Sequence, residues 1–219
     1  MDFAYAAQVL NMMLALVISL TFHEAAHAFM AKMQGDRTAQ HEGRLTLNPV
    51  PHIDPIGTLF FPLLGAMAGG GFIFGWAKPT PIDPRNFRNY KWGQIAVALA
   101  GPFMNLLLSL LSIAAFYAIG PVSEGSVWVA FSRLAQASIG INAILAVFNL
   151  LPIYPLDGGT VLYELLPYDL RRTYEDYVIP YGSFALLGLM LVGGLSWLSV
   201  VASVWIQISD RIVRSLFFT

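Results

Sequence analysis

Charged residues are absent from five long stretches of this chain, and this pattern restricts its fold more than any other feature. The charge-free stretches cover residues 3–23, 55–77, 92–123, 134–156 and 177–209. A helix that spans the hydrocarbon core of a bilayer needs about 20 largely apolar residues, so each stretch is long enough. Only 11% of the 219 residues are charged, whereas an average soluble domain carries about 25%. The sequence therefore predicts an all-α polytopic membrane protein that forms a single domain over residues 1–219.

The charge balance and the lack of cysteine exclude several classes of function. Twelve Lys and Arg residues oppose thirteen Asp and Glu residues, so the net charge is −1 and no basic surface for nucleic acid is expected. The chain has no cysteine. Any metal site must therefore use His, Asp or Glu as ligands.

The stretch 55–77 differs from the other four because it is rich in glycine and contains two prolines. Both residue types are unfavourable in a straight helix, and irregular backbone at membrane depth is tolerated where it packs against protein. Basic residues precede and follow it, so a spanning helix here would divide them between both sides of the membrane, against the positive-inside tendency. We therefore expect 55–77 to dip into the membrane and return to the cytoplasmic side.

The remaining four stretches predict four spanning helices. Their expected bounds are 5–32, 92–119, 128–152 and 178–203. The expected cytoplasmic segments are 33–91, which contains the dip, and 153–177; the tail 204–219 follows the last helix. Within that tail, residues 205–217 place Trp205, Ile208 and Ile212 on one stripe, which is typical of an amphipathic helix in the membrane interface.

Two cytoplasmic segments have the pattern of short strands. Residues 43–47 alternate in polarity, and residues 72–84 are strand-like but are interrupted by prolines, which suits an edge strand. We expect short cytoplasmic β-hairpin elements here. They could pair with an extended peptide through an exposed edge, or they could simply cover the protein at the membrane surface.

The first predicted helix carries the residues His23-Glu24-Ala25-Ala26-His27. Residues four apart lie one above the other on the same helical face, so His23 and His27 can share one metal ion. Glu24 beside them can reach a water molecule on that metal. Ionisable residues inside a membrane helix are costly and need partners, so this motif favours a metal site over a pair of interfacial histidines.

Two histidines leave the metal one protein ligand short. The candidates for the third ligand are His41, His52, Asp54, Asp83 and Asp157, and less attractively Glu42 and Glu164. Asp157 stands out because it ends the uncharged stretch 134–156 and is followed by two glycines. Its alternative role is to cap the N-terminus of a following helix, and the residues alone favour neither role.

These motifs together resemble the site-2 protease family of intramembrane zinc metalloproteases. The resemblance rests first on the histidine motif of the first helix and on the pattern NxxPxxxLDG over residues 149–158. Residues 100–105, with the sequence AGPFMN, resemble the glycine-containing motif of that family's intervening core helix. The segments 43–49, 52–55 and 75–79 look like those of the short bacterial and archaeal members.

The resemblance implies an activity and a set of site residues. It implies that His23, His27 and Asp157 bind one zinc ion, and that Glu24 activates the water that attacks the peptide bond. It favours a role for Asn149 near the scissile bond, where it would hold the substrate strand or the developing oxyanion. For Asn105 two roles stay open: the same contact with the substrate, or an ordinary hydrogen bond between helices.

The expected substrate is the transmembrane segment of another membrane protein, cleaved within the lipid bilayer. We expect a prokaryotic cell membrane with the active site near its cytoplasmic side. The chain lacks the space for the PDZ or CBS domain of longer members. A metal-ion transporter is the alternative, because intramembrane His, Glu and Asp also mark ion pathways, although here they gather at one depth.

Overall fold

The computed structural model describes residues 3–67, 75–123 and 125–217, and the elements within them are helices. Three of these helices are long and apolar enough to cross a membrane. They are α1 (Phe3–Gln34), α4 (Tyr90–Ile119) and α5 (Trp128–Asn149). At 1.5 Å per residue even α5 is about 33 Å long, which exceeds a hydrocarbon core of roughly 30 Å. The predicted class, an all-α membrane protein, is confirmed.

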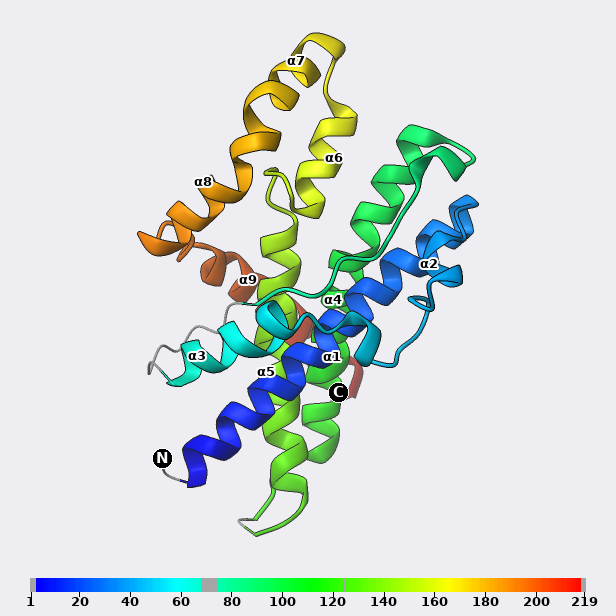
Figure 1. Ribbon diagram of the computed structural model, residues 1–219. Helices are drawn as coiled ribbons and strands as arrows, with labels where there is room; N and C mark the ends of the chain where they lie inside the picture. Colours follow the sequence, from blue (N-terminus) through cyan, green and yellow to red (C-terminus); the bar gives the residue numbers. More distant parts are fainter. Residues whose placement is uncertain (1–2, 68–74, 124, 218–219) are drawn as a thin grey trace.

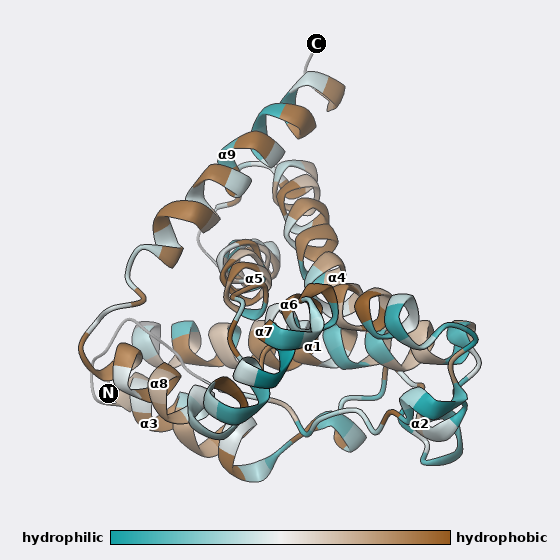
Figure 2. Ribbon diagram, turned by 90° about the horizontal axis from the view of Figure 1, so that it is seen from above, coloured by the Kyte–Doolittle hydropathy of each residue, from teal (hydrophilic) through white to brown (hydrophobic). Residues whose placement is uncertain are grey.

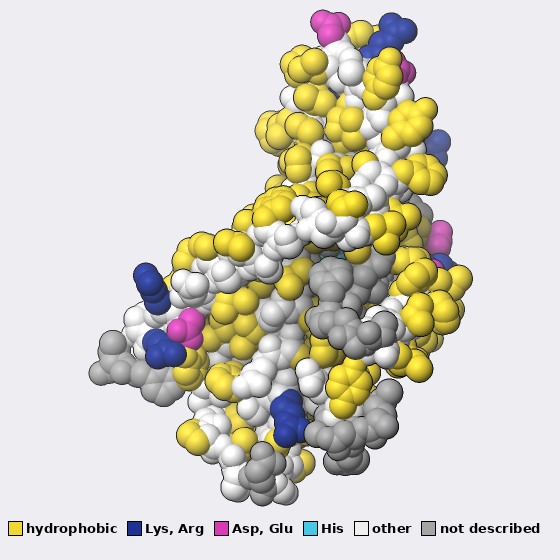
Figure 3. Space-filling model, turned by 90° about the vertical axis from the view of Figure 1, so that its left-hand side faces the viewer, with side chains coloured by type: hydrophobic (Ala, Val, Ile, Leu, Met, Phe, Trp, Pro, Cys, Tyr) yellow, Lys and Arg dark blue, Asp and Glu magenta, His cyan; other side chains and the backbone are white. Residues whose placement is uncertain are grey.

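The three long helices pack against one another and form the centre of the molecule (Figure 1). Small side chains lie at their contacts: Ala15, Ala31 and Ala143 are completely buried. Small residues let helix backbones approach closely, which is how helices associate in a membrane without a hydrophobic driving force. Large apolar side chains instead face outward, as Phe103 and Leu111 do on α4, where 63% and 53% of their surface is exposed. Figure 3 shows one such face, which is made mostly of hydrophobic side chains.

Shorter helices complete the fold. Beside α1 lie α2 (Thr38–His41) and α3 (Phe61–Met67), and α3 continues a wider helical turn over Pro55–Phe60. After α5 the chain forms α6 (Asp157–Leu165), α7 (Tyr168–Thr173), a wide turn at Tyr174–Val178 and α8 (Ile179–Leu191). The last helix is α9 (Leu198–Phe217). In Figure 2 it lies along the outside of the bundle, where it contacts α4 and α5.

The single helix predicted over 178–203 is wrong, because the chain breaks between α8 and α9. Gly193 adopts φ +70°, a conformation that favours glycine. The N–H of Gly193 donates to Met190 O at 3.1 Å, and the N–H of Gly194 donates to Leu189 O at 2.7 Å. This pair of bonds is the Schellman motif that ends a helix. The chain then turns, and α9 starts in a new direction.

The expected β-hairpin elements do not form within the described residues. Residues 43–47 make bends, and residues 75–83 run extended without a strand partner; residues 72–74 lie outside the described residues. Pro79 and Pro81 remove two backbone donors from the second segment. Its remaining N–H groups bond elsewhere: those of Trp76 and Lys78 donate to Gly57 O at 3.2 Å and His52 O at 2.9 Å.

The described part of the predicted dip, residues 55–67, forms one short apolar helical segment that is not long enough to be a spanning helix. Residues 68–74 lie outside the described residues, so the membrane dip stays a prediction. The predicted amphipathic helix over 205–217 lies within α9, which carries exposed Ile208 and Ile212 beside charged Asp210 and Arg211.

Candidate metal centre

The two histidines of α1 lie side by side in the protein interior. His23 is 5% exposed and His27 is 7% exposed, and their Nε2 atoms are 3.0 Å apart. Both residues lie on the face of α1 that packs against α4. The helical spacing of four residues thus brings the two imidazoles together, as the sequence predicts.

Each histidine is fixed through its other ring nitrogen. Nδ1 of His23 lies 2.6 Å from Asn105 Oδ1, and Nδ1 of His27 lies 2.7 Å from the backbone oxygen of Val97. Both partners are acceptors, so each Nδ1 carries a proton, and each Nε2 faces the other donor groups of the cluster. Such outer partners set the tautomer and the ring orientation of metal-binding histidines.

Gly101 allows α4 to approach the histidines this closely. A Cβ added at this position would lie 2.5 Å from His23 Cε1 and 2.5 Å from His27 Nε2. No side chain fits in that space. The glycine of the AGPFMN motif is therefore explained by contact with the imidazoles, and the adjacent Pro102 is buried inside the same helix.

Asp157 reaches the histidines through the tight loop that follows α5. The loop 150–156 folds tightly against the start of α6, where a Cβ on Gly159 would lie 2.6 Å from the backbone of Ile153 and Tyr154. Asp157 is the first residue of α6, and the cap position is held by Leu156 without a side-chain cap. The N-cap role for Asp157 is therefore not seen, and its carboxylate points toward α1.

The three side chains form a set of donors that fits one zinc ion. Asp157 Oδ2 lies 3.3 Å from His23 Nε2, and Asp157 Oδ1 lies 3.4 Å from His27 Nε2. Tetrahedral zinc with bonds of about 2.0–2.1 Å places its donors about 3.3–3.4 Å apart, so both carboxylate distances match and the Nε2–Nε2 distance of 3.0 Å is slightly shorter. Among the described residues this is the one group of three such side chains with metal-binding geometry.

The charge of Asp157 also suits a cation. Its Oδ2 is buried and has no hydrogen-bond partner in the described structure. Burial raises the pKa of Asp157, but the hydrogen bonds and charges of His23 and His27 outweigh it and lower that pKa to about 2. The carboxyl group is therefore ionised at neutral pH, as a metal ligand must be.

Glu24 lies beside the three ligands in a cleft of about 920 Å³. Its Oε2 accepts a hydrogen bond of 2.8 Å from the N–H of Thr80, and its backbone oxygen accepts one of 3.1 Å from the Thr80 hydroxyl. The extended segment 75–83 thus covers this side of the cleft. The protein orients Oε2 of Glu24, and the other carboxylate oxygen accepts no hydrogen bond from the described residues and can meet a water molecule.

Asp36 holds the far end of that segment against α1. It is completely buried, and its Oδ2 accepts a 2.8 Å hydrogen bond from the N–H of Asp83. Its Oδ1 accepts bonds from the Asn86 side chain at 3.0 Å and from the N–H of Thr38 at 3.0 Å. Burial raises the pKa of Asp36, but these hydrogen bonds lower it by more. The charged Asp36 carboxylate therefore holds in place the segment that covers the cleft.

The two asparagines singled out in the sequence occupy different places. Asn149 lies at the end of α5 and lines the cleft, with its Nδ2 donating to Leu145 O at 2.9 Å. Asn105 is completely buried behind His23 and does not line the cleft. Its Nδ2 donates to Asn142 Oδ1 at 2.8 Å, and Asn142 Nδ2 donates to Ser138 O at 2.9 Å.

Sequence reasoning missed Asn142, Thr80 and Asp36. Asn142 could have been noticed as a second polar residue within an apolar stretch, like Asn105. No comparable signal marks Thr80 or Asp36, because their partners lie 56 and 47 residues away along the chain.

The other candidate ligands lie outside this cluster. His41 and Glu42 are exposed, and Nε2 of buried His52 lies 3.0 Å from the backbone oxygen of Thr46. Three acidic candidates have structural partners: Asp54 caps the turn at Pro55, Asp83 pairs with Arg85, and Glu164 pairs with Gln94 and Arg171.

Comparison with known proteins identifies a peptidase family. Residues 119–191 match the family model of Peptidase family M50. The matched range contains Asn149 and Asp157 and lies C-terminal to the two histidines.

Two curated relatives extend over most of the chain. YwhC of Bacillus subtilis, whose full name is "Putative zinc metalloprotease YwhC", is 32% identical over 209 residues, covering 89% of this chain and 92% of that protein. Rip2 of Mycobacterium tuberculosis, named "Putative zinc metalloprotease Rip2", is 30% identical over 196 residues, covering 86% of this chain and 68% of that protein. No solved structure gives a significant match.

Proposed function

The chain belongs to peptidase family M50 and is a zinc metalloprotease of the membrane, and we propose that His23, His27 and Asp157 hold its zinc ion. The observation that carries this assignment is the spacing of the three donor groups, with the Nε2–Nε2 separation of 3.0 Å and the carboxylate oxygens 3.3 and 3.4 Å away. The protonated Nδ1 atoms, held by Asn105 and Val97, support it.

Zinc bound there supplies a Lewis acid that makes water a nucleophile near neutral pH. Glu24 acts as the general base: its free carboxylate oxygen takes a proton from the attacking water and later delivers a proton to the leaving amine. The hydrogen bond from the N–H of Thr80 keeps the Glu24 carboxylate in the cleft. The apolar walls around it, among them Leu20, Val97 and Phe148, limit the access of bulk water.

The two asparagines have separate roles in this proposal. Asn149 lines the cleft and binds the backbone of the substrate near the scissile bond, through its Oδ1 or its second N–H. Asn105, which is completely buried, acts through His23 as a positioning residue and does not touch the substrate. An oxyanion role for Asn105 is therefore not part of the proposal.

The proposed substrate is the transmembrane segment of another membrane protein. A helical segment hides its peptide bonds, so a short stretch must unwind before it enters the cleft. The proposed location is a prokaryotic cell membrane with the site near the cytoplasmic side, where the basic residues of 32–44 and 78–91 gather in the sequence. The transporter alternative receives no support from the curated relatives, whose names describe metalloproteases.

The decisive experiment compares wild-type protein with Glu24→Gln in lipid vesicles that contain zinc and single-span peptides. We expect cleavage by the wild type and a loss of about 10²–10⁴-fold in the variant, the usual contribution of general acid–base catalysis. Zinc content stays at one ion per chain in both proteins, because Glu24 is not a ligand.

Glu42→Gln is the matched control, since it makes the same chemical change on an exposed residue away from the cleft. Equal cleavage by Glu24→Gln and Glu42→Gln would overturn the assignment of the base. Zinc entry into the vesicles without any proteolysis would overturn the proposed activity in favour of transport.

A further inference from the structure

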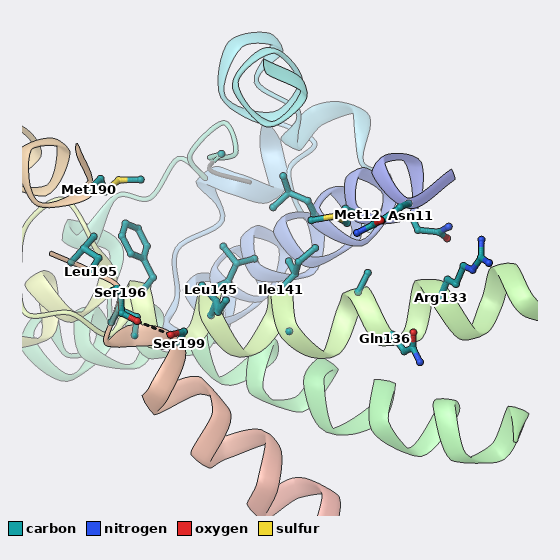
Figure 4. Close-up of a pocket in the computed structure, with 18 of the residues that line it drawn as sticks. Asn11, Met12, Arg133, Gln136, Ile141, Leu145, Met190, Leu195, Ser196 and Ser199 are labelled. Atoms are coloured by element: carbon teal, nitrogen blue, oxygen red, sulfur yellow. Dashed lines mark hydrogen bonds between the residues drawn. The ribbon is translucent and has the colours of Figure 1, made fainter. Parts of the chain in front are cut away.

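A second cavity, of about 1160 Å³, runs along α5 on the side that faces the first half of α1 (Figure 4). Its far wall is the turn between α8 and α9, with Met190, Leu195 and Ser196. Along α5 the lining repeats with helical spacing from Arg133 through Ile141 to Phe148. One face of a spanning helix is thus exposed in a groove over most of its length.

The groove joins the candidate metal cleft. Leu145, Phe148 and Met190 line both cavities, so the end of the groove near the C-terminus of α5 opens beside Asn149. An elongated group lying in the groove would therefore reach the cleft with one end. This continuity distinguishes the groove from an ordinary surface furrow that lipid fills.

The polar side chains of the groove are the second observation. Gln8 and Asn11 of α1 and Arg133 and Gln136 of α5 line its half farther from the metal site. These residues belong to helices that cross the membrane, where polar and charged side chains are costly unless they find partners. Within the described part of the chain, Arg133 is exposed and takes part in no ion pair or hydrogen bond. Asn11 Nδ2 already donates to Ala7 O at 2.8 Å, but the acyl chains of lipids offer the other polar groups no hydrogen-bond partner.

Gly140 is the third observation. It lies in the middle of the groove, and a Cβ built on it would have no atom of the described residues within 4 Å. Together with Ala137 it leaves a shallow, smooth stretch of α5. Small residues of this kind let the backbone of another helix approach closely. The shape fits a helix better than a branched lipid tail.

We propose that this groove binds the transmembrane helix of the substrate and that Arg133 pairs with a carboxylate on that helix. The inference rests on the proposed function and adds a substrate class to it: a span with an acidic residue near the end remote from the cleavage site. Gln8, Asn11 and Gln136 supply further hydrogen bonds around that carboxylate. This ion pair fixes how far the substrate helix reaches along the groove, and so determines which peptide bond enters the cleft.

The separation of the two contacts limits where the acidic residue stands. Arg133 and Asn149 are 16 positions apart on α5, which at 1.5 Å per residue is about 24 Å. A fully helical substrate covers that distance with about 16 residues. If four residues near the cleft are extended at about 3.3 Å each, about 11 suffice. The acidic residue therefore lies about 11–16 residues from the scissile bond.

The first test maps occupancy of the groove in the Glu24→Gln protein in lipid vesicles, which binds substrate without cleaving it. A photocrosslinking residue replaces Gly140 in the groove or Leu107 on the exposed side of α4. Both positions are 12 residues from the helix ends at Trp128 and Ile119, so their depth is matched. We expect crosslinks to a single-span peptide from position 140 that exceed those from position 107 at least tenfold.

Crosslinks to lipid alone at position 140, or to a second copy of this chain, would overturn the proposed occupant. Equal peptide crosslinking from both positions would overturn it as well. Thermal unfolding of each crosslinker variant is recorded alongside, and a position whose variant does not fold is replaced by Ile144 in the same groove.

The second test measures the preference of the protease for an acidic residue. Peptides carry Asp or Gln at each position 8–20 residues from the cleavage site, and the ratio of kcat/KM for Asp over Gln is recorded. We expect a ratio of about ten at 11–16 residues in the wild type and a ratio near one for Arg133→Gln. For Arg133→Glu we expect the preference to move to Lys at the same positions.

The two proposals fail in different ways. If wild-type protein with zinc cleaves no peptide, the proposed function fails, whatever the crosslinks report. If peptides are cleaved but the Asp-to-Gln ratio is the same in the wild type and both Arg133 variants, the charge pairing in the groove is overturned and the protease assignment stands.

Discussion

Gly101 connects a sequence motif with the shape of the metal centre. Its hydrogen occupies a place where a methyl group would lie 2.5 Å from both imidazoles. We expect Gly101→Ala to fold, because Ala is more favourable than Gly within a helix by about 1 kcal/mol. The displaced imidazoles should bind zinc at least tenfold more weakly. Chelator competition measures this affinity.

Gly188→Ala is the matched control for that variant, because Gly188 lies in α8 and a Cβ there has no atom within 4 Å. Its zinc affinity should equal that of the wild type. Wild-type zinc affinity in Gly101→Ala would show that the histidines have room to move, contrary to the close packing described here.

Asn142 is expected to control His23 through a chain of amides. Its Nδ2 donates to Ser138 O, which turns its Oδ1 toward Asn105 and thereby turns Asn105 Oδ1 toward His23. Asn142→Leu removes the shorter of the two hydrogen bonds of Asn105 Nδ2 and leaves only the 3.3 Å bond to Ser19 O, so Asn105 holds Nδ1 of His23 less firmly. Loss of such outer partners lowers metal affinity by about 10–100-fold, and we expect zinc binding to weaken by at least tenfold.

Ser109→Ala tests whether this effect is specific. It removes a different contact between α4 and α5, the 3.0 Å bond from Ser109 to Ile139 O, and leaves the amides intact. We expect its zinc affinity to match the wild type. If Asn105→Leu weakens zinc binding and Asn142→Leu does not, Asn105 orients His23 without help from Asn142, and the prediction for Asn142 is wrong.

Carboxylates of α1 and its following turn hold the second half of the extended segment 75–83: Glu24 binds Thr80, and Asp36 binds Asp83 and the nearby Asn86. We expect Asp36→Ala to increase hydrogen exchange at residues 80–86 and to reduce cleavage, while zinc content stays unchanged. Asp169→Ala, on the exposed surface of α7, should change neither measurement. If Asp36→Ala lost zinc as well as the protection of residues 80–86 from hydrogen exchange, Asp36 would be needed for the metal centre and not only for this segment.

These contacts of Asp36 have a defined pH dependence. The hydrogen bonds to Asp36 lower its pKa in the folded protein, so its contribution to stability is complete above the unfolded value of about 3.9. That contribution is lost as the pH falls from there through the folded pKa. Protection of residues 80–86 should therefore be constant between pH 5 and 8 and should decline below about pH 4 in the wild type, but not in Asp36→Ala.

The helices that could be predicted are those marked by a pattern within their own residues. The predicted helix bounds 5–32, 92–119 and 128–152 lie within three residues of those of α1, α4 and α5, and the spacing of His23 and His27 placed both on one face. The break at Gly193 also has a local signal, the pair Gly193-Gly194. We predicted one continuous helix there because the apolar stretch 177–209 is long. Length is weak evidence for a continuous helix when two glycines offer a helix end.

The contacts that could not be predicted join residues far apart in sequence. Segment 72–84 has the alternation of a strand, yet its described N–H groups bond to Gly57, His52, Glu24 and Asp36, which no periodicity reveals. The proposed third ligand shows the same limit. Spacing left Asp157 between cap and ligand, and only the fold of loop 150–156 aims its carboxylate at α1.

The metal centre joins parts of the molecule that are otherwise held by weak forces. His23 and His27 belong to α1, Asn105 belongs to α4, and Asp157 follows α5. Between such helices the membrane supplies no hydrophobic driving force, so their association depends on packing and on polar contacts of about 1 kcal/mol each. A bound cation that ties α1 to α6 is therefore expected to stabilise the whole bundle and not only the site.

Removal of zinc tests this coupling. Free zinc at about 100 times its Kd stabilises a protein by about 2.7 kcal/mol, which for a chain of this size corresponds to about 5–10 °C in Tm. We expect a chelator to lower the Tm of the wild type by that amount and zinc to restore it. Glu24→Gln should show the same shift because it keeps all three ligands, whereas Asp157→Asn should show little or none. An equal shift in Asp157→Asn would place the stabilising cation elsewhere, because binding without that carboxylate cannot tie α1 to the end of α5.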